Sequence, residues 1–135
     1  RNSLLKQSHK GTGESSRVVL AAEFKLHPAR VDELEARVWE IQNNRRATQP
    51  AGASAGCMFK NPPGDYAGRL IDQAGLKGAR IGGAQISTVH ANFFVNDQDA
   101  SAEDIRQLMA LAWHGVKEHY DIELEPEIEL IGEWR

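Results

Sequence analysis

Hydrophobic positions along the chain repeat with two different periods, and each period predicts one kind of element. Residues 17–26 begin with an apolar run and then alternate between apolar and polar side chains, which predicts a strand that ends before Pro28. Two longer segments repeat apolar residues at steps of three and four, which predicts amphipathic helices over residues 29–43 and 102–120. Ser101 directly precedes the second helix and is a typical N-cap residue.

The middle of the chain is rich in glycine. Residues 52–83 hold eight of the twelve glycines, a density that indicates tight turns and close approach of the backbone to a ligand or to another strand. A loop-rich surface region is the alternative interpretation. A short helix is expected at residues 66–74, with strands at 84–87, 92–96 and 128–131. These elements predict an α+β fold with a small mixed sheet and two longer helices around the glycine-rich central segment.

Length and charge limit the possible function. The chain has 135 residues, enough for one domain, and a net charge of -3, which argues against a nucleic-acid partner. No apolar stretch reaches the length of about 20 residues that a membrane span needs, so no membrane partner is expected. The sequence begins at Arg1 without a methionine and continues with a polar, loop-like run. We therefore expect it to be the C-terminal part of a longer protein.

Known site motifs are mostly missing from the sequence. The histidines are dispersed without the HxxxH or HExxH spacing, so no metal site is expected. The glycines match neither GxGxxG nor a phosphate-binding GKS or GKT loop, which does not support a self-contained nucleotide-binding fold.

Two local features could carry chemistry. Cys57, the single cysteine, lies between Gly56 and an apolar pair, with Lys60 three residues further on. Its thiol can serve as an acid, a nucleophile or a small buried side chain, and the residue alone favours the last of these. Glu125 and Glu127 flank a proline, where carboxylates form either a solvated face or a general acid or base.

Several motifs together resemble one enzyme family. Residues 55–62 read AGCMFKNP, residues 67–87 read AGRLIDQAGLKGARIGGAQIS, residues 90–96 read HANFFVN and residues 124–134 read LEPEIELIGEW. In this order they resemble the C-terminal portion of UDP-N-acetylenolpyruvoylglucosamine reductases (the MurB family). The resemblance implies a flavoenzyme that uses FAD and NADPH to reduce UDP-N-acetylglucosamine enolpyruvate to UDP-N-acetylmuramate in bacterial peptidoglycan synthesis.

The resemblance also implies roles for single residues. Cys57 stands at the position of the proton donor, and Glu127, the second carboxylate of LEPEI, matches the catalytic glutamate. Arg1 matches the arginine of a YRxS motif, and its guanidinium suits the carboxylate of the enolpyruvyl group. Expected substrate-binding residues are Asn61, Gln85 and His90 near the UDP-sugar, with Lys60 and Arg46 at the diphosphate.

The same resemblance predicts how the chain divides. Residues 1–27 are expected to close an FAD-binding domain that lies mostly upstream, residues 28–125 to bind substrate, and residues 126–135 to return to the flavin domain as a final strand. The chain by itself is then expected to be inactive, and the parent enzyme to be cytoplasmic. The alternative functions are a non-catalytic α+β module that binds a nucleotide-sugar, and an interaction module for a protein partner.

Overall fold

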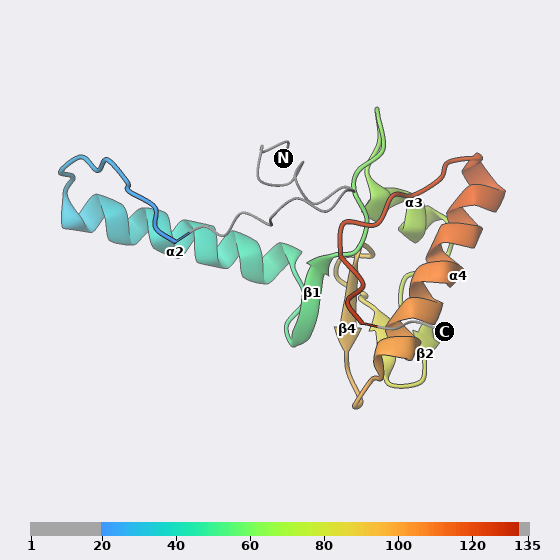
Figure 1. The fold of residues 1–135 in the computed structure, drawn as a ribbon. Coiled ribbons are helices and arrows are strands. Elements are labelled where there is room, and N and C mark those ends of the chain that lie inside the picture. Colours follow the sequence, from blue (N-terminus) through green and yellow to red (C-terminus); the bar gives the residue numbers. More distant parts are fainter. Residues whose placement is uncertain (1–19, 133–135) are drawn as a thin grey trace. The chain divides into compact units, whose positions relative to one another are not determined.

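The computed structural model describes residues 20–132, which hold three helices and four strands. The chain divides into two compact units, residues 1–34 and 35–135, and the four strands of the described residues belong to the second. The helices are α2 (Val31–Thr48), α3 (Ala67–Gln73) and α4 (Ala102–Tyr120), and the strands are β1 (Ala53–Cys57), β2 (Arg80–Ile81), β3 (Ala84–Ile86) and β4 (Phe93–Asn96) (Figure 1).

The four strands form one sheet in the order β1-β4-β3-β2, and all its pairings are antiparallel. Gly82 and Gly83 make the tight turn between β2 and β3. A Cβ on Gly83 would lie 2.0 Å from the carbonyl oxygen of Gln98, so only glycine fits there. The α+β class is confirmed, but the sheet is not mixed as expected. Strands β2, β3 and β4 follow one another through short reversals, whereas a parallel pair needs a long crossover, and the longer connection from β1 brings it antiparallel to β4.

Helix α4 packs against β2, β3 and α3 and covers the core (Figure 1). Its start is a capping box: Ser101 Oγ accepts from the Asp104 backbone N–H at 3.1 Å, and Asp104 Oδ2 accepts from the Ser101 backbone N–H at 2.9 Å. This confirms the predicted helix and its N-cap. The largest buried apolar side chains are Met58, Phe59, Leu70, Ile71, Ile86, Phe94, Leu108 and Val116.

Helix α2 runs further than the sequence pattern predicts. The expected end at residue 43 is wrong, because Arg45 and Arg46 occupy the last turn, where positive charge is favourable for the helix dipole. Thr48 Oγ1 also donates to the carbonyl oxygen of Asn44 at 2.7 Å, and the helix stops before Pro50. No side chain of α2 is buried in the described part of the chain. Among the described residues no helix is long and apolar enough to cross a membrane.

Two predicted strands are wrong, and two observed strands, β1 and the two-residue β2, were missed. Residues 20–26 form no strand, and the part of that prediction over residues 17–19 lies outside the described residues. Residues 128–131 form none either, and Leu20 and Ile131 are 92% and 87% exposed. A strand needs a hydrogen-bonding partner, and alternation alone does not supply one. Strand β1, with the small residues ASAGC, forms in an expected loop because β4 pairs with it.

Candidate functional site

A cavity of about 380 Å³ opens beside the end of β1. Cys57, Asn61 and His90 line it together, although they come from three separate parts of the sequence. Its volume lies at the lower end of the range for small-molecule sites, about 300–1,000 Å³. The other residues that line it are Tyr66, Gly68, Arg69, Asp72, Lys77, Val89, Ala91 and Asn92.

A bulge in β1 sets the position of Cys57. Ser54 pairs with Val95 and Cys57 with Phe93, so β1 advances three residues while β4 advances two. Gly56, directly before the cysteine, has a φ of +84°, which a side chain would strain. Because side chains alternate along a strand, one extra residue turns Cys57 to the opposite face from the one that regular pairing would give.

His90 is held on the cavity wall by contacts with its ring. Nδ1 accepts a hydrogen bond from the backbone N–H of Asn92 at 3.2 Å, and the ring meets that of Phe93 edge-on at 5.0 Å between centroids. A backbone N–H can only donate, so Nδ1 is the acceptor here and Nε2 is the ring nitrogen that carries a hydrogen. Gly68 of α3 lies close by, and a Cβ there would come within 2.8 Å of His90 Cε1.

The side chain of Asn61 lines the cavity and also makes a hydrogen bond that stabilises the fold. Its Oδ1 accepts from the backbone N–H of Ala67, the first residue of α3, at 3.1 Å. The first N–H groups of a helix have no partner within the helix, so this bond stabilises the start of α3. Asn61 therefore connects the start of α3 to the wall of the cavity.

The segment that carries Glu127 lies against the chain just after Cys57. The backbone N–H of Glu127 donates to the Met58 carbonyl oxygen at 2.8 Å, and Lys60 donates from its backbone N–H to the Glu125 carbonyl oxygen, also at 2.8 Å. Glu127 is half-buried. Lys60 does not line the cavity; its ammonium group forms an ion pair with the exposed carboxylate of Glu125.

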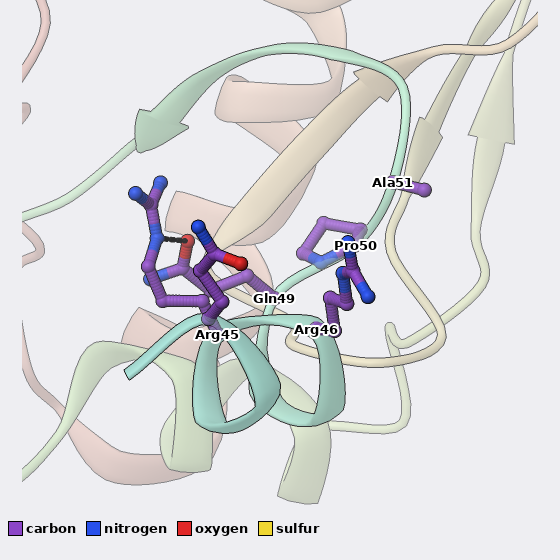
Figure 2. Close-up of a pocket in the computed structure, with 6 residues that line it drawn as sticks. Arg45, Arg46, Gln49, Pro50 and Ala51 are labelled. Atoms are coloured by element: carbon purple, nitrogen blue, oxygen red, sulfur yellow. Dashed lines mark hydrogen bonds between the residues drawn. The ribbon is translucent and has the colours of Figure 1, made fainter. Parts of the chain in front are cut away.

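Two other predicted substrate residues lie elsewhere. Gln85, in β3, donates from Nε2 to the carbonyl oxygen of Gly78 at 3.2 Å and accepts from Arg80 at 3.1 Å. Arg46 lines a second cavity of about 400 Å³ at the end of α2. Figure 2 shows Arg45 bonded to Gln49 there, with Arg46 beside Pro50. Arg1 lies outside the described residues.

Cations at the rim of the first cavity are matched by carboxylates. The Arg69 guanidinium donates to both carboxylate oxygens of Asp65, and with the backbone N–H of Tyr66 it lowers the pKa of that carboxyl. Lys77 pairs with Asp72 at 2.9 Å. The rim is therefore close to neutral, and the polar groups within it are a thiol, an imidazole, a phenol and amides. Such a set can donate hydrogen bonds and a proton to an anionic substrate.

The structure brings Cys57, Asn61 and His90 together, whereas Glu127 does not line the cavity and its backbone is bonded to Met58, the residue after Cys57. The sequence reasoning missed Asn92, which is 2% exposed and lines the same cavity. The sequence feature that could have indicated it is a single polar residue within the otherwise apolar run Ala91–Val95. Among residues 20–132 no group of three or more His, Cys, Asp or Glu side chains could hold a metal ion.

Comparisons with known proteins point to one family. Residues 46–131 match the family model "UDP-N-acetylenolpyruvoylglucosamine reductase, C-terminal domain". The reductase of Chloroflexus aggregans is 47% identical over 131 residues, which are 97% of this chain and 43% of that protein. The reductase of Bacillus licheniformis is 40% identical over 136 residues, covering 100% of this chain and 71% of that protein.

A solved structure agrees with these sequence matches. The crystal structure of the reductase from Thermus caldophilus superposes with a TM-score of 0.62 at 47% identity, over 76% of this chain and 37% of that one. The reductase of Rubrobacter xylanophilus is 46% identical over 86% of this chain and 39% of that protein. The chain thus spans about two fifths of the length of the Rubrobacter and Chloroflexus relatives.

Proposed function

The chain belongs to the UDP-N-acetylenolpyruvoylglucosamine reductase family, and we propose that it supplies the substrate-binding part of such an enzyme. The proposed reaction reduces the enolpyruvyl ether of UDP-N-acetylglucosamine to the lactyl ether of UDP-N-acetylmuramate, a step of peptidoglycan synthesis. The proposed place of the reaction is the bacterial cytoplasm.

One observation carries the proposal: Cys57 lines a ligand-sized cavity because the bulge at Gly56 turns it there. The reduction adds a hydride to one vinyl carbon and a proton to the other, so it needs one proton donor at the reacting carbons. A thiol, with a reference pKa of about 8.5, releases a proton to an enolate-like intermediate more readily than an alcohol does. Cys57 leaves that step as a thiolate and is then reprotonated.

Other residues of the chain act around this proton transfer. His90 presents Nε2–H, which can donate to an anionic oxygen of the substrate, and Asn61 offers its amide at the same wall. Glu127 is proposed to polarise the substrate's carboxylate or to relay the proton, and Arg1 to bind that carboxylate. Gln85, Lys60 and Arg46 stay predicted ligands of the UDP-sugar, though each must reach it from outside this cavity.

The described residues do not fit FAD by themselves. The cavity of about 380 Å³ is small for a dinucleotide with two ring systems, and its polar groups suit a small anion. Binding of FAD and NADPH, which would supply the hydride, is therefore proposed for the whole enzyme rather than for this chain. The division into residues 1–27, 28–125 and 126–135 stays a prediction, and so does the inactivity of the isolated chain.

The test uses the whole-length enzyme with Cys57→Ala, Cys57→Ser and the control Gln98→Ala, at an exposed residue that does not line the cavity. We expect Cys57→Ala to lower kcat about 10²- to 10⁴-fold while oxidation of NADPH by the bound flavin stays unchanged. Cys57→Ser should keep part of the turnover, because a hydroxyl can donate a proton in the same place. Full turnover of Cys57→Ala would contradict the assignment of the proton donor.

A titration tests whether the chain binds the nucleotide-sugar. Titration of UDP-N-acetylmuramate into the 135-residue chain should shift the backbone amide signals of residues 57, 61 and 90. If whole-length protein binds this nucleotide-sugar but never oxidises NADPH in the presence of UDP-N-acetylglucosamine enolpyruvate, the chain belongs to a non-catalytic binding module.

A further inference from the structure

Asn92 is a polar side chain inside the hydrophobic core. It is 2% exposed, between the buried Ala91 and the start of β4. Burial of an amide without hydrogen-bond partners costs roughly 1–3 kcal/mol, so an asparagine persists in such a place when it has partners. Within the described residues no buried side-chain nitrogen or oxygen lacks one.

The partners of the Asn92 side chain are both on one residue, Phe59. Its Oδ1 accepts from the Phe59 backbone N–H at 3.0 Å, and its Nδ2 donates to the Phe59 carbonyl oxygen at 2.8 Å. The side-chain amide therefore pairs with Phe59 in the way that a neighbouring strand would. This pairing comes directly after the bulge, where regular pairing of β1 with β4 ends at Cys57.

The backbone of Asn92 makes two more bonds at the same wall. Its carbonyl oxygen accepts from the Met58 N–H at 2.9 Å, and its N–H donates to His90 Nδ1 at 3.2 Å. One buried residue thus holds the two residues that follow Cys57 and also fixes the ring orientation of His90. The positions of the Cys57 and His90 side chains therefore both depend on the position of Asn92.

We propose that Asn92 is the positioning residue of the site, acting through Phe59 and Met58 to hold the Cys57 thiol at the angle from which it donates its proton. The inference rests on the proposed role of Cys57. Without the Asn92–Phe59 pairing, the segment from Cys57 onward would be held on this side by the Cys57–Phe93 pairing and the Met58–Asn92 bond alone, and the direction of the thiol would be less tightly fixed. Catalytic geometry is sensitive to this, since a misplacement of about 1 Å can cost about 10²-fold in rate.

The test in the whole-length enzyme is Asn92→Asp, which keeps the shape and the acceptor but replaces the Nδ2 donor by an oxygen facing the Phe59 carbonyl. We expect kcat to fall about 10- to 100-fold with KM changed by no more than about twofold, because the backbone N–H of residue 92 still orients His90 while the proton donor moves. The matched control is Asn96→Asp at the end of β4, where the side chain accepts from the Ala100 N–H and should keep wild-type kcat.

A second readout does not need turnover. Cys57 is the single cysteine of the 135-residue chain, so the rate of alkylation by iodoacetamide reports on this thiol alone. Asn92→Asp should change that rate severalfold, and Asn96→Asp should leave it unchanged. If Asn92→Asp does not fold, Asn92→Ser takes its place, because its shorter side chain has a single polar atom instead of the separate donor and acceptor of the amide.

A third measurement uses the unchanged chain. The Phe59 amide should be protected from hydrogen exchange as strongly as the paired amides of β4. Rapid exchange at Phe59, or normal kcat in Asn92→Asp while Cys57→Ala is inactive, would overturn the positioning role alone. Full activity of Cys57→Ala would instead overturn the proposed function on which it rests.

Discussion

The backbone N–H of Glu127 donates to the carbonyl oxygen of Met58 at 2.8 Å. With the matching bond between Lys60 and Glu125, it holds the segment around Pro126 antiparallel to the chain that follows Cys57. The contact is made by main-chain atoms, so the position of Glu127 does not depend on its own side chain. Substitutions at this residue therefore test chemistry without moving the segment.

The first prediction concerns that carboxylate. In the whole-length enzyme Glu127→Gln should lower kcat about 10²-fold or more, because an amide cannot take up or pass on a proton. Thermal stability should stay unchanged, since the backbone bond to Met58 remains. Steady-state kinetics and a melting curve check this, with the exposed Glu129→Gln as the control. Wild-type turnover in Glu127→Gln would mean that this carboxylate belongs to a solvated face.

The second prediction concerns the close approach of α3 to the cavity. A Cβ at Gly68 would lie 2.8 Å from His90 Cε1 and 3.2 Å from His90 Nδ1, so Gly68→Ala must push the imidazole aside. We expect the affinity for UDP-N-acetylmuramate to fall about tenfold, measured by calorimetry on the whole-length enzyme.

Gly115→Ala is the matched control for this helix substitution. Its Cβ would meet only the flexible end of Leu76, at 2.7 Å from Cδ1, and Gly115 does not line the cavity. Affinity should therefore stay close to that of the wild type. Equal affinities of Gly68→Ala and wild type would show that His90 does not contact the ligand.

The third prediction concerns the start of α4. Ser101→Ala removes the acceptor for the Asp104 N–H and should lower the free energy of unfolding by about 1 kcal/mol. Ser101→Asp keeps an acceptor in the N-cap position and should keep most of the stability. Urea unfolding of the 135-residue chain measures both. A Ser101→Ala chain as stable as the wild type would show that the capping box contributes little here.

The fourth prediction concerns acid stability. The Arg106 guanidinium, and then the Gln107 amide, donate to Glu103 and lower the pKa of its carboxyl from 4.5 to about 2. A carboxyl whose folded-state pKa is lowered binds its proton more readily when unfolded, so it stabilises the fold above about pH 4.5. That contribution is lost as the pH falls from there through about 2.

Glu103→Gln and Arg106→Gln should therefore both flatten the fall of stability over this pH range. The effect is small because the pair is solvent-exposed, and added salt should reduce it further. Urea midpoints at several pH values check it. A wild-type slope in both variants would show that Glu103 does not contribute to the acid sensitivity.

Local sequence determined the elements whose hydrogen bonds are made within one segment or one tight turn. The period of α4, its Ser101 cap and the short helix α3 could be predicted because a helix bonds to itself. The motif around Cys57 likewise indicated the family, since a motif consists of residue types that can be recognised without knowing the fold.

Tertiary structure decided what depends on residues far apart in the chain. The alternation in residues 20–26 and the apolar residues of 128–131 gave no strand, whereas β1 formed from small residues because β4 lies beside it. The bulge at Gly56 turns Cys57 to its face, and Asn92 pairs with Phe59, 33 residues earlier. A strand, its register and a buried amide each need a partner, and only the folded chain brings that partner within hydrogen-bonding distance.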